Sequence, residues 1–360
     1  MSSPPLDQVR PAIRAMAGYT PGEQPADGQK VVKLNTNENP FPPPPRVFAA
    51  LQAALDERLR LYPEPGSRPV REAAARAYGV AADAVLVGNG SDDILTILMR
   101  TFVDPGDTVL ALRPSYSLYE PLTTLQGGRY EECPWGNAGA LPVEDLAARN
   151  AKLILITRPN APTGHATPLE AVAQLCQRTR AIVLLDEAYA DFADDNGLPL
   201  LSRHPNLVIS RSFSKSLCLA GLRLGLCFAD AQLVREMHKV RDSYNVDRLA
   251  QAAAVAALDH REDFAPLVAA IRHQRQRLTW ELRQRAFDVI DSQANFIFAH
   301  IPPGRRDGPG WVAGLKARGV LVRHFTHDPE LLPWLRITIG TPEQLDRLLE
   351  EVDHLRADNT

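Results

Sequence analysis

Lys215 lies in the stretch RSFSKSLCLAGLRLG (residues 211–225), which follows the apolar run NLVI. A lysine at the end of a buried strand loses hydration, and this loss disfavours its charged form. Its amine could then stay partly neutral and serve as a nucleophile. The alternative is an ordinary lysine that extends its ammonium group into solvent. The residues that follow the other predicted strands are needed to choose between these two interpretations.

Four other apolar runs are also followed by polar groups: VLVG by NGSDDIL, TVLAL by RPSYSLY, LILIT by RPNAPTG, and AIVLL by DEAYADF. Ligands of open α/β sheets bind beyond the carboxyl ends of the strands. We expect Ser91 to cap a helix whose first amides favour an anion. Tyr116 supplies an aromatic ring and Asn160 an amide, and Asp186 is a carboxylate that is costly to bury unless it is paired. Taken singly, most of these groups also fit a capped helix, a packed ring or a proline turn.

Taken together, the groups match the needs of a flat, cationic, phosphorylated aldehyde cofactor. Such a cofactor needs an amine for its aldehyde, an anion for its ring nitrogen and a face on which its ring can stack. It also needs a donor to its ring oxygen and a cradle for its phosphate. Lys215, Asp186 and Tyr116 could meet the first three needs, and Arg223 lies eight residues after Lys215.

The apolar runs lack the alternation of half-buried strands, which indicates strands that are buried on both faces. Helical segments separate several of them, so the sequence predicts an α/β domain with a mainly parallel sheet. Residues 1–45 contain PGEQPADGQ and NPFPPPPR, and we expect an extended arm without regular elements there. The last part of the chain predicts a smaller α+β domain. The expected division is 1–45 for the arm, 46–265 for the large domain and 266–360 for the small domain.

Composition limits the class of protein. The chain has 360 residues, 45% of them hydrophobic, and a formal net charge of −3, so electrostatics gives no reason to expect nucleic acid or an anionic membrane as a partner. We find no secretory signal and no run long enough for a membrane span. The four cysteines form no CxxC pair, which favours reduced thiols in the cytoplasm. HFTH, at residues 324–327, lacks a second ligand pair, so no metal site is expected.

The motifs of the chain resemble those of a known family. SFSKSLCLAGLRLG is similar to the lysine-attachment motif of class II pyridoxal-phosphate aminotransferases, which have the fold-type-I architecture. GYTPGEQP, LNTNENPFPP, YPEPGSRPVREAAARAYGV, GNGSDDIL, RPNAPTG, DEAYADF, YNV and LRITIG occur in the order seen in the histidinol-phosphate aminotransferase family. The resemblance runs from about residue 18 to residue 341.

The resemblance implies a role for each group around pyridoxal 5′-phosphate. Lys215 would attach the cofactor and carry a proton to and from the substrate. Asp186 would pair with the ring nitrogen, Tyr189 would hydrogen-bond the ring oxygen, and Tyr116 would stack on the ring. The residues implied for the phosphate are Ser91, Asp92 through its amide, Ser212, Ser214, Arg223 and, from the partner subunit of a homodimer with shared active sites, Tyr62. Many relatives have an asparagine where this chain has Ala161, and Asn160 is the nearest amide that could replace it.

For the substrate, the resemblance implies that Arg336 binds an anionic group. Arg323, together with Tyr19 and Asn37, would complete a phosphate site. The implied reaction transfers an amino group from L-histidinol phosphate to 2-oxoglutarate, giving imidazole-acetol phosphate and glutamate, in histidine biosynthesis. The alternatives are a decarboxylase of a phosphorylated amino acid, an aromatic aminotransferase and a non-catalytic binding protein. A nicotinamide dehydrogenase is disfavoured because no GxGxxG follows a strand.

Overall fold

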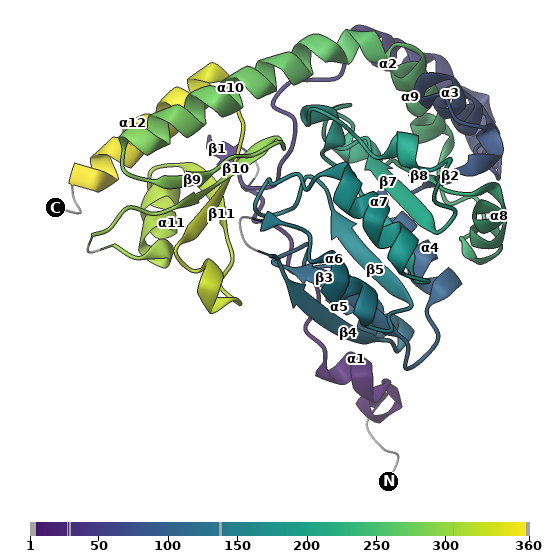
Figure 1. Ribbon diagram of the computed structural model, residues 1–360. Helices are drawn as coiled ribbons and strands as arrows, with labels where there is room; N and C mark the ends of the chain where they lie inside the picture. Colours follow the sequence, from purple (N-terminus) through teal and green to yellow (C-terminus); the bar gives the residue numbers. More distant parts are fainter. Residues whose placement is uncertain (1–4, 27, 29, 137–138, 305, 358–360) are drawn as a thin grey trace.

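The computed structural model describes residues 5–26, 28, 30–136, 139–304 and 306–357, and the strands among them form two sheets. Figure 1 shows the larger sheet in teal and blue, with the smaller one beside it in yellow-green. Within this described part of the chain, no helix combines the length and apolar character that crossing a membrane requires.

The larger sheet has seven strands in the order β2-β8-β7-β6-β5-β3-β4. All neighbours pair in parallel except β8, which is antiparallel to β2 and β7. The five predicted apolar runs became β2, β3, β5, β6 and β7, so the expected mainly parallel α/β fold is confirmed. The strands are β2 (Val85–Gly88), β3 (Thr108–Arg113), β4 (Arg129–Pro134), β5 (Leu153–Thr157), β6 (Ile182–Asp186), β7 (Leu207–Ser212) and β8 (Gly225–Phe228).

Helices cover both faces of this sheet, which explains the continuous apolar runs of its strands. Successive strand residues join different clusters: Leu110 packs with residues of α3, α6, α7 and α9, whereas Val109 and Ala111 pack with residues of α4, α5 and α8. The helices of this part are α2 (Pro45–Ala54), α3 (Arg68–Tyr78), α4 (Ser91–Phe102), α5 (Tyr119–Gln126), α6 (Val143–Ala148), α7 (Leu169–Arg178), α8 (Ala231–Val240) and α9 (Arg248–Asp259).

The smaller sheet has five strands in the order β1-β11-β12-β10-β9. Buried side chains of α10, α11 and α12 form a common core with it. Its elements are β1 (Val32–Leu34), β9 (Asp288–Ile290), β10 (Phe296–His300), β11 (Val320–His324), β12 (Trp334–Thr338), α10 (Ala265–Gln284), α11 (Gly308–Ala317) and α12 (Pro342–Ala357). Short 3₁₀ helices lie at Pro5–Gln8, Glu57–Arg60, Ala82–Ala84, Ala190–Phe192, Leu198–Leu200, Ala220–Leu222, Arg261–Phe264 and Pro329–Leu331.

The expectation that residues 1–45 have no regular elements is wrong. A short helix, α1, spans Pro11–Ala15, and β1 pairs in parallel with β11, with Val32 opposite Val320. Residues 32–34 contain no proline, so their N–H groups can donate to a strand ladder. The strand brings the chain to the smaller sheet before it enters the larger one.

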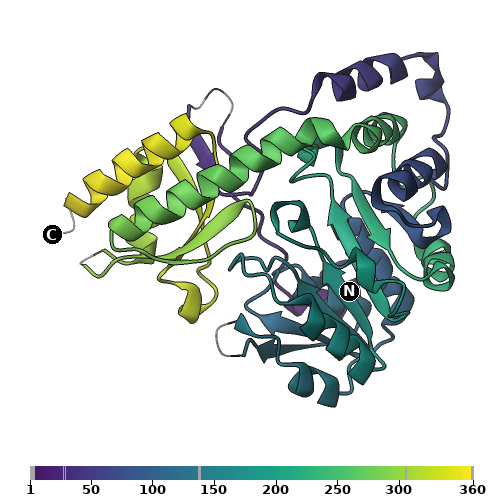
Figure 2. The same cartoon turned by 45° about the horizontal axis from the view of Figure 1, so that its top comes forward.

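The long helix α10 starts beside the larger part of the molecule and extends along the smaller sheet, as both views show (Figures 1 and 2). It therefore links the two parts as a continuous rod. The proposed division at residues 45 and 265 stays a prediction. Any such small domain would also include β1, because this strand lies at the edge of the smaller sheet.

Gly225, the first residue of β8, approaches the backbone that opens α4. A Cβ at Gly225 would lie 2.6 Å from the Gly90 carbonyl carbon and 2.7 Å from the Ser91 nitrogen. Gly225→Ala should therefore lower the free energy of unfolding by about 1–3 kcal/mol, as overpacking against rigid groups does. Gly221→Ala is the matched control, since nothing lies within 4 Å of its Cβ position. Denaturant unfolding measures both, and equal stabilities would contradict this packing argument.

Candidate active site

A cavity of about 370 Å³ lies where the two sheets meet, and it collects most of the residues that the sequence singled out. It is at the carboxyl ends of β6 and β7, as expected for an open α/β sheet. The predicted residues that line it are Tyr19, Asn37, Ser91, Asp92, Tyr116, Asp186, Tyr189, Ser212, Ser214, Lys215, Arg223, Arg323 and Arg336.

Asp186 ends β6 and is 3% exposed. Burial raises the pKa of its carboxyl group, and three hydrogen bonds oppose that shift. Oδ2 accepts from the Tyr119 hydroxyl at 3.0 Å, and Oδ1 accepts from the Ser210 hydroxyl at 3.0 Å and the Ala188 amide at 3.2 Å. Ser210 is the residue opposite Asp186 on β7. The sequence analysis missed Tyr119 and Ser210, because only the strand order places them here.

Lys215 follows β7, and its Nζ donates to the Thr36 carbonyl at 3.3 Å. Burial, and then the positive charge of Arg336, lower the pKa of Lys215 to about 8. Arg223 also lowers this pKa, but it is the weaker of the two arginines. A substantial fraction of the amine is therefore neutral near pH 8, as a nucleophile requires.

The start of α4 and Arg223 form one end of the cavity. Ser91 is the first helical residue rather than the cap, because Gly90 (φ 86°) occupies the capping position, so the expected cap was wrong by one residue. Arg223 has a left-handed φ of 51°, and its Nη2 lies 3.1 Å from Asp92 Oδ2. A Cβ at position 90 would lie 2.7 Å from this nitrogen. The helix amides, Arg223 and the Ser212 and Ser214 hydroxyls suit an anion.

Two tyrosines flank the cavity between these groups. Tyr116 donates its hydroxyl to Asp92 Oδ1 at 3.2 Å, and its ring makes edge contacts with Tyr19 and Tyr119 at centroid distances of 6.0 and 5.6 Å. Tyr189 is buried, and its oxygen accepts a hydrogen bond from Asn37 Nδ2 at 3.0 Å. Both rings are thus held in place before any ligand binds.

Arg323 and Arg336 form a second cationic part of the cavity wall. They are directly opposite each other on β11 and β12, a position where like charges destabilise a sheet. Arg323 donates to the carbonyls of Thr20 and Pro21, and Arg336 to that of Asn35. Burial lowers the pKa of Arg336. Neither guanidinium forms an ion pair with a carboxylate of the described residues, so this part of the cavity wall is suited to an anionic ligand.

Two predicted site residues lie outside the cavity lining. Asn160 is fully buried, its Nδ2 donates to the Pro114 carbonyl, and its Oδ1 accepts from the amide and hydroxyl of Thr163. Its side chain holds the turn, and Ala161 rather than Asn160 lines the cavity. The expectation that Asn160 replaces the missing asparagine stays a prediction. Tyr62 is 77% exposed and stacks on Tyr244 at a centroid distance of 4.4 Å.

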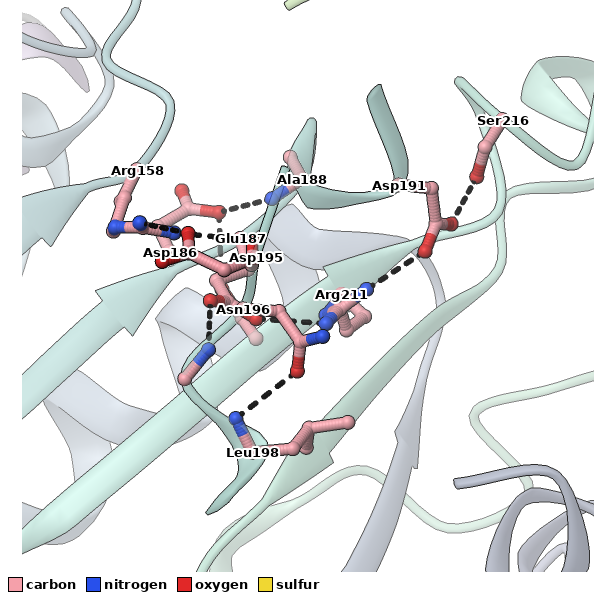
Figure 3. Close-up of polar contacts among 12 residues, drawn as sticks. Arg158, Asp186, Glu187, Ala188, Asp191, Asp195, Asn196, Leu198, Arg211 and Ser216 are labelled. Carbon is pink, nitrogen blue, oxygen red and sulfur yellow. Dashed lines mark hydrogen bonds and ion pairs between the residues drawn. The ribbon is translucent and has the colours of Figure 1, made fainter. Parts of the chain in front are cut away.

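An ion network that starts at Glu187, next to Asp186, was also missed (Figure 3). Arg211 of β7 pairs with Glu187 at 2.8 Å and with Asp191 at 2.9 Å, and Asp191 accepts from the hydroxyl of Ser216. Glu187 follows Asp186, and Ser216 follows Lys215, so the network links the two strand ends that carry these groups. The signal was present in the sequence as charges inside the apolar runs AIVLLDE and LVISRSF.

The HFTH segment has a structural explanation. His324 lies at the end of β11, and its Nε2 is 2.8 Å from the Leu332 carbonyl oxygen. Among the residues that the structure describes, no group of three or more histidines, cysteines and carboxylates is arranged to hold a metal ion.

Comparisons with known proteins agree with this geometry. The family model "Aminotransferase class I and II" matches residues 29–352. The chain belongs to this family. It is 45% identical over 351 residues to the histidinol-phosphate aminotransferase of Microcystis aeruginosa, covering 98% of this chain and 99% of that protein. It is 44% identical over 354 residues to that of Synechocystis sp., covering 97% and 98%. The chain therefore also belongs to the histidinol-phosphate aminotransferase family.

A solved structure of a histidinol-phosphate aminotransferase has the same fold as this chain. The histidinol-phosphate aminotransferase of Sinorhizobium meliloti, in complex with pyridoxal-5′-phosphate, matches with a TM-score of 0.85 at 23% identity, covering 97% of this chain and 98% of that chain. The predicted fold-type-I architecture and the predicted enzyme class, an aminotransferase, are confirmed. Enzymes of this family depend on pyridoxal phosphate, so the predicted cofactor is confirmed as well.

The cavity fits this cofactor on structural grounds alone. Among the described residues the hydrogen-bond partners of the buried Asp186 carboxylate are uncharged, which leaves its charge available to a protonated ring nitrogen. Lys215 offers an amine of lowered pKa for the aldehyde. Arg223 and the opening of α4 offer a phosphate site. These three features match the ring nitrogen, the aldehyde and the phosphate of the cofactor.

The lowered pKa of Lys215 can be tested without the cofactor. Labelling of the cofactor-free protein with acetic anhydride requires the neutral amine, so modification of Lys215 should rise with pH around a midpoint near 8. Arg336→Met should move this midpoint upward, and Arg223→Met should move it upward less, because Arg336 is the stronger influence. Mass spectrometry of the Lys215 peptide measures the labelled fraction. A wild-type midpoint near the ordinary lysine value of 10.5 would contradict the argument.

Proposed function

We propose that this enzyme transfers the amino group of L-histidinol phosphate to 2-oxoglutarate, giving imidazole-acetol phosphate and glutamate in histidine biosynthesis. The observation that supports this substrate best is the facing pair Arg323 and Arg336. A phosphate dianion can engage both guanidinium groups, whereas one suffices for a carboxylate. The names of the two relatives at 45% and 44% identity support the same substrate.

Each side chain has a proposed role that follows from its position. Lys215 holds the cofactor and then moves a proton to and from the substrate carbon that carries the amine. Asp186 keeps the ring nitrogen protonated. When bound, pyridoxal phosphate is an electron sink that stabilises negative charge on that carbon. Tyr116 supports the ring face and Tyr189 donates to the ring oxygen. We assign the cofactor phosphate to Ser91, the Asp92 amide, Ser212, Ser214 and Arg223, all of which line the cavity.

The substrate phosphate would lie between Arg323, Arg336 and the exposed Tyr19, which also line the cavity. These residues differ from those assigned to the cofactor phosphate, so the two phosphates would have separate partners. The same arginine pair could accept the carboxylates of 2-oxoglutarate in the second half of the reaction. No observation favours the decarboxylase or the aromatic aminotransferase.

Arg323 should decide between phosphate and carboxylate substrates. Hydrogen bonds to charged groups contribute about 1.5–3 kcal/mol, so Arg323→Ala should lower kcat/KM for histidinol phosphate by about tenfold to a hundredfold. Weak activity on a monoanionic aromatic amino acid should fall less, because it needs only Arg336. Arg336→Ala should impair both substrates, and the exposed Arg235→Ala serves as the control. Steady-state kinetics with product analysis measures this.

Two results would contradict the substrate assignment. An equal loss on both substrates in Arg323→Ala would make Arg323 a structural residue. Release of carbon dioxide from a phosphorylated amino acid, with no amino transfer from histidinol phosphate by the wild type, would favour the decarboxylase.

We further propose a homodimer with shared active sites, in which Tyr62 reaches the cofactor phosphate of the partner subunit. Tyr62 lies outside the cavity of its own chain, and the neighbouring Leu55, Leu59 and Leu61 are exposed as well. Exposed apolar residues that lie close together are typical of subunit interfaces. We also propose the cytoplasm as its compartment, which agrees with the four free cysteines.

Shared sites predict complementation between two inactive variants. A hybrid dimer of Tyr62→Ala and Lys215→Ala chains has one site with both residues intact, so mixing should raise the activity above that of either parent. Lys215→Ala mixed with a Tyr62→Ala/Lys215→Ala double variant is the control and should gain nothing. Activity after subunit exchange, verified by mass spectrometry of tagged chains, is the measurement. Exchange without recovered activity would place Tyr62 outside the partner's site.

A further inference from the structure

We infer that Asn37 sets the direction of the Tyr189 hydroxyl proton, and that Thr338 of the smaller sheet holds Asn37 in the orientation that this requires. The inference rests on the proposed function, because its consequence falls on the ring oxygen of the cofactor. It makes Asn37 and Thr338 positioning residues that act through Tyr189.

Asn37 is fixed at the cavity wall. It is 1% exposed and has a left-handed φ of 55°, a conformation that asparagine tolerates better than most residues. Its carbonyl accepts from Asn295 Nδ2 at 3.0 Å, and its Nδ2 lies 3.0 Å from the Tyr189 hydroxyl. The side chain therefore reaches from the segment after β1 to the tyrosine.

Two hydrogen bonds join Thr338 to Asn37, and both are satisfied in the observed orientation of the Asn37 amide. The Thr338 oxygen accepts from the Asn37 backbone N–H at 2.9 Å, since an N–H can only donate. The Thr338 hydroxyl donates its single proton to Asn37 Oδ1 at 3.1 Å. With Oδ1 engaged as an acceptor, the NH₂ group is the end that faces Tyr189.

This orientation leaves the proton of Tyr189 for the cavity. The phenol oxygen accepts from Asn37, and its one proton does not have to satisfy that neighbour. The ring cannot turn away easily, because its edge packs against Phe296 at a centroid distance of 5.1 Å. Phe296 is opposite Thr338 in the β10–β12 ladder, so the smaller sheet fixes both the ring and the hydroxyl.

Tyr189 is the more important as a donor because its neighbours in the cavity wall offer no replacement. Ala161 lines the same cavity without a polar side-chain atom, and the amide of Asn160 is used within its own turn. A ring oxygen on this side of the cofactor would thus rely on Tyr189. If the Asn37 amide turned over, Oδ1 would take the Tyr189 proton and the donor would be lost.

Replacement of the threonine tests this chain of hydrogen bonds. Thr338→Val keeps the shape but removes the hydroxyl, so the Asn37 amide is free to turn over. Binding of pyridoxal 5′-phosphate to the cofactor-free protein should weaken by about tenfold or more, as expected for loss of a hydrogen bond to a charged group. The midpoint of the pH titration of the bound cofactor's absorbance should rise by about one unit, because the lost donor stabilised the deprotonated form. Thr338→Ser, which keeps the hydroxyl, should restore both values.

Two further variants separate orientation from packing. Tyr189→Phe should change both values in the same direction, and Thr338→Val should add nothing in the Tyr189→Phe background. Asn37→Gly keeps the left-handed backbone at no steric cost. It should weaken binding less than Thr338→Val, because an unheld hydroxyl can still donate, whereas a turned amide captures its proton.

The outcomes distinguish the inference from the proposed function. If Thr338→Val has its full effect in the Tyr189→Phe background, the threonine acts through packing and the inference is overturned, while the proposed function stands. The same holds if Thr338→Ser fails to restore binding. If the wild-type protein does not bind pyridoxal phosphate at Lys215, the proposed function fails and the inference fails with it.

Discussion

The desolvated carboxylate of Asp186 is the interaction on which the active site depends. A carboxylate in the middle of a protein is costly unless its charge is met, and here its protein partners are two hydroxyls and one amide. These partners come from α5, β7 and the turn after β6, so the carboxylate keeps its place only if the larger sheet forms in its observed order. A protonated ring nitrogen is the opposite charge that this arrangement leaves to a ligand.

The cavity also contains positive charges that are not paired with carboxylates of the described residues. Lys215, Arg323 and Arg336 all line the cavity, and burial together with the charge of a neighbouring arginine lowers the pKa of the lysine and of Arg336. A fold optimised only for stability would pair them with carboxylates, as it pairs the buried Arg211 with Glu187 and Asp191. In the part of the chain that the structure describes they have no such partners, which makes a neutral amine available and favours anionic ligands. The unpaired buried cations therefore both lower the stability of the fold and make the chemistry possible.

The smaller sheet supplies side chains to the cavity and holds others in position. Its strand β12 presents Arg336 to the cavity and, two residues later, Thr338 to Asn37. Residues two apart on a strand point to the same face, so one strand carries both the residue proposed for the substrate anion and the residue that contacts Asn37. The register between β11 and β12 places Arg323 beside Arg336 on that face. Because β1 belongs to this sheet, the segment that carries Asn37 is anchored there too.

The sequence by itself determined the features that depend on neighbours along the chain. Continuous apolar runs identified the buried strands, and the group after each run identified Asp186, Lys215 and the start of α4 as members of one site. Only the tertiary structure decided which distant groups meet: Tyr119 and Ser210 at Asp186, Arg336 as the stronger charge near Lys215, and Thr338 at Asn37. It also decided that Asn160 serves its own turn and that β1 joins the smaller sheet. Local patterns report burial and turns, whereas these pairings follow from strand order and register, which no short stretch of sequence encodes.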